Sequence, residues 1–536
     1  PGIDHSPARD GRSAVWKARL TPPAGPQKET TDAEEYQPEF SPDGKEIAYL
    51  EDRVAVKILN LESKNTRLVL PADKNYSYAD GDQYFQWSPD SKWLLVQFGQ
   101  PERVMSPEIG LVAADGKSEV TNLTLSGYDD YMPKWVLDGK AMIWGTNRDG
   151  ALRQGGGAFT LDVRAMFFEK AAYDRFRLSK EEFALVKEME EKEDEGKEDE
   201  EKDEDKEDEE APAEIVIDRE NLTDRHLKLT THTSRAGDWV LSLDGEKLFY
   251  LTTFEKGQDL WVTETRTRET KLLAKLGARV TSFEMSKDGK FLLILADGTP
   301  KKIETESGKV TPVKTGGEMV LKRADEREYI FEHIWRQLRE KFYVEDLHGV
   351  DWDAYKVAYE RFLPHINNNY DFAEMLSEML GEMNASHTGC YYRPTWPNTD
   401  QTASLGLFYD DGYTGDGLKV DEIIAGGPLD KAGVKLKAGH VIEKIDGEEI
   451  SAVGDYAQLL NRKVDQRVLL SVHDPDKGER WDEVVKPIGP RAEYQLLYER
   501  WVRNRRAEVE RLSDGKLGYV HVRSMNDASM RTVFEE

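Results

Sequence analysis

The chain has 536 residues, which is enough for about three or four domains of ordinary size. It carries 74 lysines and arginines against 103 aspartates and glutamates, a formal net charge of −29. This balance argues against a protein that binds nucleic acid or an anionic membrane surface, because both partners require a concentrated basic face. No apolar run approaches the roughly 20 residues of a membrane-spanning helix, so we expect a soluble protein.

Cys390 is the single cysteine, so the chain can form no internal disulfide bond and no cysteine-built metal site is expected. The sequence contains no Walker loop, no His-Glu-x-x-His and no Gly-x-Ser-x-Gly motif. We therefore expect neither a metal nor another cofactor. The sequence begins at Pro1 without a recognisable signal peptide, and we expect it to be part of a longer polypeptide.

An internal repeat runs through the N-terminal part of the chain. A turn containing aspartate, usually Asp-Gly, precedes an apolar segment at residues 36–49 and 85–95, with weaker copies at 135–140, 243–250 and 286–292. The aspartates at 43, 90, 138, 244 and 288 are separated by 47, 48, 106 and 44 residues. Three of these spacings match a propeller blade of about 40–50 residues, and Asp-Gly is typical of a tight hairpin turn. The repeat predicts a β-propeller of five or more blades over residues 1–314.

The long spacing of 106 residues predicts one blade plus an insertion at about residues 165–215. Within Lys187–Glu210 there are 17 acidic residues and 5 lysines, a net charge of −12. Such a stretch cannot bury apolar area, so it is expected to be a solvated helix or a disordered loop. A tail that binds a partner is the alternative.

Helical spacing of apolar residues begins after Lys314 and predicts a small helical domain over residues 315–395. Its helices are expected at 325–343, 352–363 and 371–383, the last with Asp371 as N-cap and Glu374 completing a capping box. His387 follows the last helix. A histidine there can take a proton from a nucleophile, because its unperturbed pKa lies near neutrality. The alternative is a structural histidine that is hydrogen-bonded to the backbone.

The next segment, residues 396–490, resembles a PDZ domain. The resemblance rests on Gly426–Val434 followed by Leu436–Ile450, with His440 where the family usually has an aspartate. Leu405, Gly406, Leu407 and Phe408 resemble the loop with which PDZ domains bind the carboxylate of a peptide C-terminus. Residues 491–511 predict a charged helix and residues 517–522 a strand, the beginning of an incomplete α/β peptidase core over 491–536.

The order of these parts resembles the tricorn protease family, within the carboxy-terminal processing group of serine peptidases. The resemblance implies that His387 is a general base and that Ser386 helps to orient it. The nucleophilic serine and a supporting glutamate are then expected beyond Glu536, so the chain would be truncated before the nucleophile domain and inactive alone. The resemblance further implies a peptide or unfolded-protein substrate, a homo-oligomer and a cytoplasmic location, or a periplasmic one if a signal peptide is missing.

Weaker candidate residues and one alternative function remain. Cys390 lies three residues after His387 and is a weaker candidate nucleophile, because a strand would turn the two side chains to opposite faces. His440 and His473 lie inside the PDZ domain and are expected at its surface. Propeller and PDZ modules also occur in proteins without catalysis, so a peptide-binding scaffold is the alternative function.

Overall fold

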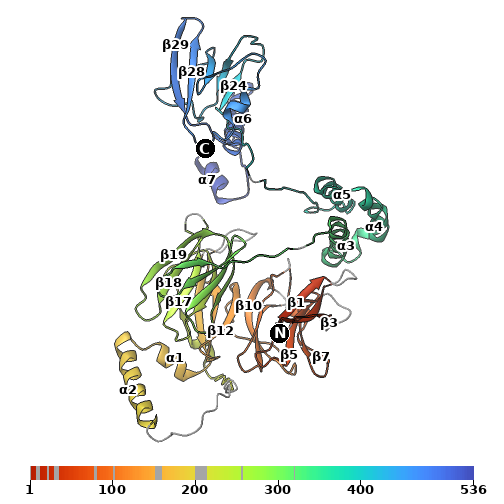
Figure 1. Cartoon of the computed structure of the whole chain (residues 1–536), viewed down its shortest axis with the longest axis vertical. Helices are drawn as coiled ribbons and strands as arrows, with labels where there is room; N and C mark the ends of the chain where they lie inside the picture. Colours follow the sequence, from red (N-terminus) through yellow and green to blue (C-terminus); the bar gives the residue numbers. More distant parts are fainter. Residues whose placement is uncertain are drawn as a thin grey trace. The chain divides into compact units, whose positions relative to one another are not determined.

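A computed structural model describes residues 2–7, 13–20, 23–28, 35–77, 81–100, 103–150, 160–198, 214–254, 257–318, 320–396 and 398–535. The chain forms two compact units, Pro1–Cys390 and Tyr391–Glu536 (Figure 1). Among the helices of these described ranges, none is long and apolar enough to cross a membrane.

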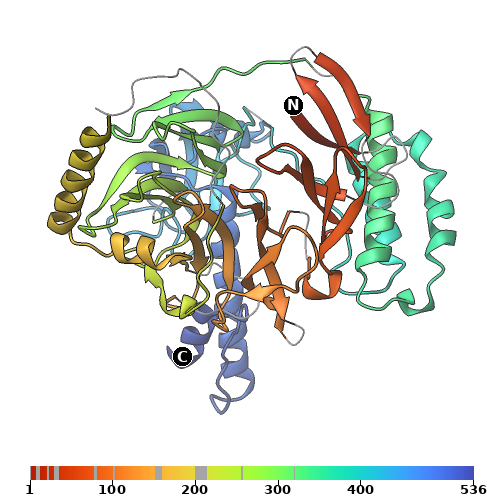
Figure 2. The same ribbon diagram turned by 90° about the horizontal axis from the view of Figure 1, so that it is seen from below.

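Antiparallel sheets follow one another along the first unit, and in each sheet the strands pair in chain order. The described residues form one sheet of three strands and five of four strands (Figure 2). Their strands are β1–β3 (Gly2–Pro7, Ser13–Leu20, Pro23–Lys28), β4–β7 (Glu35–Phe40, Glu46–Glu51, Ala55–Asn60, Thr66–Leu70), β8–β11 (Phe85–Trp87, Trp93–Gln100, Arg103–Ala113, Thr121–Asn122), β12–β15 (Asp130–Val136, Ala141–Thr146, Asp162–Phe167, His226–Lys228), β16–β19 (Ala236–Leu241, Lys247–Thr252, Gln258–Glu264, Thr270–Ala278) and β20–β23 (Val280–Met285, Phe291–Ala296, Thr299–Glu304, Val310–Pro312).

The sheets are arranged as the blades of a propeller. The first strands of five sheets, β4, β8, β12, β16 and β20, together line one cavity of about 750 Å³. The apolar clusters lie between successive blades: one joins the second and third sheets, and others join the third to the fourth, the fourth to the fifth and the fifth to the sixth. A strand covered by a blade on each side must be apolar on both faces, and β13 is buried at every position. The predicted propeller is confirmed.

The repeated aspartate turns share one set of hydrogen bonds. In the turn between β4 and β5, Ser41 Oγ donates to Asp43 Oδ1 at 2.6 Å and accepts from the Glu46 N–H at 3.0 Å. Asp43 Oδ1 also accepts from the Lys45 N–H at 3.1 Å. The same three bonds recur at the turns that begin with Ser88, Ser242 and Ser286. The sequence repeat thus encodes a polar turn that closes each of these hairpins.

The acidic insertion lies between β14 and β15. It contains α1 (Lys170–Phe176) and α2 (Lys180–Glu198), and residues 199–213 of the predicted acidic loop lie outside the described ranges. Ser179 and Glu182 exchange side-chain-to-backbone hydrogen bonds of 2.9 and 3.2 Å, a capping box at the start of α2. Helix formation is therefore specified at the N-terminal end of the segment.

The end of the first unit is helical, as predicted, with α3 (Arg323–Lys341), α4 (Trp352–Glu360) and α5 (Asn369–Gly381). Trp335 and Trp352 join α3 to α4, since the indole N–H of each donates to the backbone carbonyl of the other at 3.2 and 2.9 Å. The predicted cap of the last helix is wrong. Asn368 is the N-cap, because its side-chain oxygen accepts from the N–H groups of Tyr370 and Asp371, both at 2.9 Å. Asp371 instead lies in the first turn.

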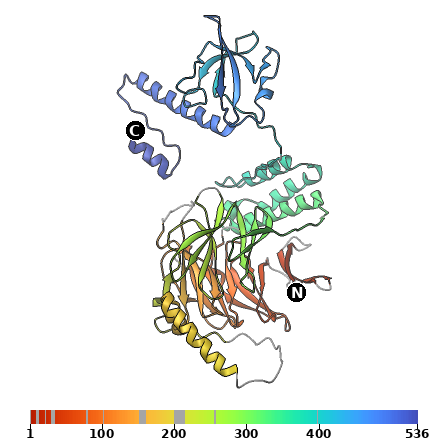
Figure 3. The ribbon, with the colours of Figure 1, turned by 60° about the vertical axis from the view of Figure 1, so that its left-hand side comes forward.

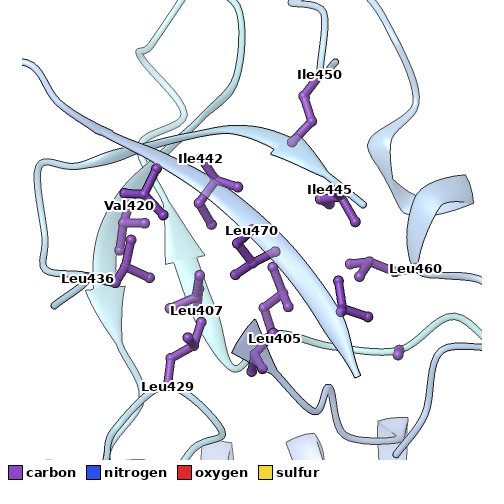
Figure 4. Packing of buried hydrophobic residues seen from close by; sticks show 14 residues of the cluster. Leu405, Leu407, Val420, Leu429, Leu436, Ile442, Ile445, Ile450, Leu460 and Leu470 are labelled. Atoms are coloured by element: carbon purple, nitrogen blue, oxygen red, sulfur yellow. The ribbon is translucent and has the colours of Figure 1, made fainter. Parts of the chain in front are cut away.

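The second unit is a PDZ-type sheet with the order β24-β25-β26-β28-β29, and β27 pairs with β26. Its core is a single apolar cluster, built from residues of five strands of the sheet and of the segments that connect them (Figure 4). The strands are β24 (Leu407–Tyr409), β25 (Leu418–Ile423), β26 (Val441–Ile445), β27 (Glu448–Glu449), β28 (Val468–Asp474) and β29 (Glu479–Val485), with a 3₁₀ helix, η5 (Tyr456–Leu460).

Two helices follow the sheet, α6 (Pro490–Leu512) and α7 (Asp527–Glu535) (Figure 3). The strand predicted at residues 517–522 is wrong, because this segment has no strand partner in the described part of the chain. It is joined to α6 instead. His521 lies against Trp501 with ring centroids 5.4 Å apart, and its Nε2 is hydrogen-bonded to the Tyr498 hydroxyl.

Candidate active site

The turn after α5 presents the predicted pair Ser386 and His387. Met383 is buried, and Ala385 and Cys390 pack against the apolar cluster of the helical region. The Thr388 hydroxyl donates to the Ala385 carbonyl at 2.9 Å, which closes the turn around the pair. With its neighbours anchored in this way, the turn exposes both Ser386 and His387.

His387 has a backbone φ of 63°, the left-handed region that few residues other than glycine adopt. This conformation is held by the anchored residues on either side. Backbone conformations of this kind cost roughly 1–3 kcal/mol and are concentrated at functional sites. The strand considered above for the segment from His387 to Cys390 is not formed, and His387 lies in a turn.

His387 lines a cavity of about 380 Å³ within the helical region. One wall is formed by the turn after α5 and the other by α3. The α3 residues are His333, Ile334, Gln337, Leu338 and Lys341, with Phe342 just after the helix. Ser386 is not among the residues that line the cavity. The two adjacent residues therefore differ: His387 lines the cavity and Ser386 does not.

The imidazole of His387 has no hydrogen-bond or ion-pair partner among the described residues. An exposed, unpaired imidazole can accept a proton from a group that enters the cavity. At the other end of the turn, Tyr359 donates to Glu382 at 2.8 Å, and burial together with this carboxylate raises the pKa of Tyr359 to about 12. Tyr359 on α4 thus fixes the start of the turn while the imidazole remains available.

The α3 wall was not found from the sequence. His333, Gln337 and Lys341 recur every four residues, which places them on one helix face beside the apolar positions Ile334 and Leu338. This polar stripe was the available signal. It was missed because the periodicity was read only for its apolar residues.

Cys390, His440 and His473, the weaker candidates from the sequence, each contact neighbouring residues of the fold. Cys390 packs against the apolar cluster, whereas His387 is exposed, so the two side chains have different environments. His440 and His473 are both half-buried rather than at the surface. His440 Nδ1 accepts from the Lys437 N–H at 3.1 Å, and His473 Nδ1 lies 3.5 Å from Glu443. In the residues that the structure describes, no group of three or more His, Cys, Asp or Glu side chains could hold a metal ion.

The predicted peptide-binding loop belongs to the second unit. Leu405 and Leu407 point into the PDZ core and are 1% and 7% exposed, and Phe408 is half-buried (Figure 4). Gly406 has a φ of 68°, and a Cβ at this position would lie 2.8 Å from Pro428 Cδ. The loop therefore requires glycine at position 406 for both reasons. It leads into β24, which lies at one edge of the sheet and, within the described part of the chain, pairs only with β25.

Known families match the two regions that flank these sites. The tricorn protease C1 domain matches residues 323–381, and the tricorn protease PDZ domain matches residues 413–489. The first match ends before Ser386 and His387, and the second begins after the loop Leu405–Phe408. The matches therefore support the two folds and leave the site residues as proposals.

Whole-chain relatives point to the same family. Tricorn protease homolog 1 of Streptomyces coelicolor is 27% identical over 518 residues, covering 90% of this chain and 46% of that protein. The tricorn protease homolog of Saccharolobus solfataricus is 24% identical over 518 residues, covering 90% of this chain and 44% of that protein.

A crystal structure of the tricorn protease superimposes with a TM-score of 0.73 at 16% identity, covering 99% of this chain and 51% of that one. At this identity the superposition supports the fold alone. The chain spans about half the length of these relatives. The two domain matches and these relatives, all below 30% identity, support membership of the tricorn protease family for this chain.

Proposed function

We propose that the protein is a serine peptidase of tricorn type that cleaves peptides or unfolded chains, with His387 as its general base. The observation that carries the proposal is the exposed, unpaired imidazole at the wall of a 380 Å³ cavity. The proposed nucleophile is a serine, and none of the site residues named above is assigned this role. The cavity gives that serine and the scissile peptide a place beside His387.

The chemistry requires a base because a serine hydroxyl is a weak nucleophile at neutral pH. His387 accepts the hydroxyl proton as the serine oxygen attacks the scissile carbonyl, and then donates it to the leaving amine. Ser386 is proposed to orient the imidazole only in the assembled site with the nucleophile, since no hydrogen bond joins the two side chains among the described residues. The Leu405–Phe408 loop binds peptide termini, and the family resemblance supports a homo-oligomer in the cytoplasm.

The test is turnover of an unstructured peptide by the purified active enzyme. His387→Ala is expected to lower turnover by about 10⁴-fold, because losing a base of this type leaves only binding and oxyanion stabilisation. Ser386→Ala should cost less, since the proton acceptor remains. The matched control is His365→Ala, another exposed histidine of the same region. Retention of more than about a tenth of the wild-type turnover by His387→Ala would show that this histidine is not the base.

A peptide-binding scaffold without catalysis is the alternative, and the 750 Å³ propeller cavity and the PDZ loop are the observations that favour it. The scaffold predicts peptide binding with no hydrolysis in any variant. The same assay with a binding readout distinguishes the two functions.

A further inference from the structure

The first turn of α6 is bonded to the peptide-binding loop of the PDZ domain. Ser404, directly before the loop, donates its hydroxyl hydrogen to the Glu493 carboxylate. The same hydroxyl oxygen accepts from the Gly406 N–H at 3.0 Å. A backbone donor of the loop is thus satisfied by Ser404, which is itself held by a carboxylate from α6.

Two tyrosines next to the loop pack against the PDZ core. Tyr409 on β24 and Tyr456 on η5 lie edge to face, with ring centroids 5.5 Å apart at 70°. Burial, Tyr456 and Glu493 raise the pKa of Tyr409, and burial and Glu493 also raise the pKa of Tyr456. The Glu493 carboxylate therefore acts on both tyrosines as well as on Ser404.

A second set of contacts fixes α6 along the sheet. Arg500 forms a two-pronged ion pair with Glu422, with N···O distances of 2.7 and 2.5 Å, and its guanidinium lies 4.7 Å from the Phe408 ring centroid. Phe408 and Glu422 are directly opposite each other on β24 and β25. One turn nearer the loop, Leu496 packs over Gly426 and Gly427. Together these contacts hold Glu493 at the loop.

We propose that α6 is a built-in competitor for the peptide C-terminus. A PDZ loop recognises a terminal carboxylate through its backbone N–H groups, and here a carboxylate of the same chain is held at the loop through Ser404. An intramolecular group competes at a high effective concentration, so a free peptide enters only when the first turn of α6 is displaced. This inference rests on the peptide-binding role proposed for Leu405–Phe408.

The test is Glu493→Ala in the whole chain, with Glu499→Ala as the matched control. Glu499 lies on the same helix and is bonded only to Gln495 among the described residues. The probes are dye-labelled hexapeptides ending in Leu, Val, Phe or Ala, each made as a free acid and as an amide. Glu493→Ala should bind the free acids at least tenfold more tightly than the wild type and Glu499→Ala do, with no change for the amides.

Three outcomes overturn the inference in distinguishable ways. If the wild type binds free acids as tightly as Glu493→Ala, α6 does not compete, and the proposed role of the loop survives. If neither binds any free acid, the loop is not a carboxylate site, and both proposals fail for the PDZ domain. Hydrogen exchange over residues 404–409 gives a readout without peptide: it should be faster in Glu493→Ala, and unchanged exchange shows that α6 does not close the loop.

Discussion

Glu39 and Glu284 face the propeller cavity from β4 and β20, two strands far apart in the sequence. Burial, and to a smaller extent the charge of Glu284, raise the pKa of Glu39 to about 7. The other charged groups that line this cavity include Lys134 and Asp238, which form an ion pair with each other at 2.5 Å. The lysine is therefore paired with Asp238, and the burial of Glu39 beside the charge of Glu284 favours the neutral form of the Glu39 carboxyl group.

Glu39 should make the propeller less stable as the pH rises. An unfolded glutamate titrates near 4.5 and the folded Glu39 near 7, so the contribution of Glu39 to stability is complete below pH 4.5 and is lost as the pH rises through 7. Glu39→Gln removes this dependence. By calorimetry, the melting temperature of Glu39→Gln relative to the wild type is expected to rise by a few degrees between pH 5 and pH 8.

The control for this titration is Glu62→Gln, which changes an exposed turn residue. The melting temperature of this variant relative to the wild type should stay flat over the same pH range. An equally flat difference for Glu39→Gln would mean that Glu39 is ionised throughout, and its position in the cavity would then have no effect on stability.

At the scale of elements, α2 shows how an acidic helix is attached to a propeller blade. Phe183 lies under two guanidinium groups, 3.6 Å from Arg266 and 5.0 Å from Arg175 measured to its ring centroid. Arg266 also pairs with Glu246 and donates to the carbonyl oxygens of Arg175, Phe176 and Leu178 at the end of α1. The attachment is thus at the N-terminal end of the insertion, before its most acidic stretch.

Removing the acidic stretch should leave the stability unchanged, whereas removing its attachment should lower it. Deletion of residues 191–210 is expected to leave the melting temperature within about one degree, because solvated surface residues contribute little. Arg266→Ala should destabilise the protein by about 1–3 kcal/mol, because the part-buried carbonyl groups of Phe176 and Leu178 and the Glu246 carboxylate lose a charged donor. Thermal unfolding of the two variants and the wild type measures both changes in stability. A large loss of stability on deletion would show that the acidic stretch packs against the protein.

The sequence predicted elements that repeat or carry local signals. The propeller was visible because each Ser-x-Asp turn carries its own hydrogen-bond donors and acceptors within six residues, and His387 because it follows a helix end. The cap at Asn368 was misplaced because Asp371 offers the same chemistry three residues later. The prediction of a strand at 517–522 was wrong, because alternating apolar and polar residues form a strand only where a partner strand pairs with them. The bond between Ser404 and Glu493 could not be predicted, since 89 residues separate the two side chains.

At the scale of the whole molecule, each compact unit has its own core. The apolar cluster of the second unit contains only residues between Ala403 and Val485, and those of the first unit lie between the propeller strands and among α3, α4 and α5. A domain with its own core can unfold as a separate cooperative transition. The helix α6 is part of the second unit, and its contacts run from Ser404 to Glu422.

Fragments of the second unit should therefore differ in stability according to whether they contain α6. Residues 402–489 are expected to fold, because they hold the whole apolar cluster. Residues 402–512 should be more stable by about 1–2 kcal/mol, since α6 adds the half-buried Glu493 contact and a part-exposed ion pair that solvent weakens. Urea unfolding followed by tryptophan fluorescence measures both, and Glu493→Ala in the longer fragment should recover part of the difference. Equal stability of the two fragments would mean that α6 rests on the sheet without stabilising it, and a helix held so weakly could not exclude a peptide from the loop.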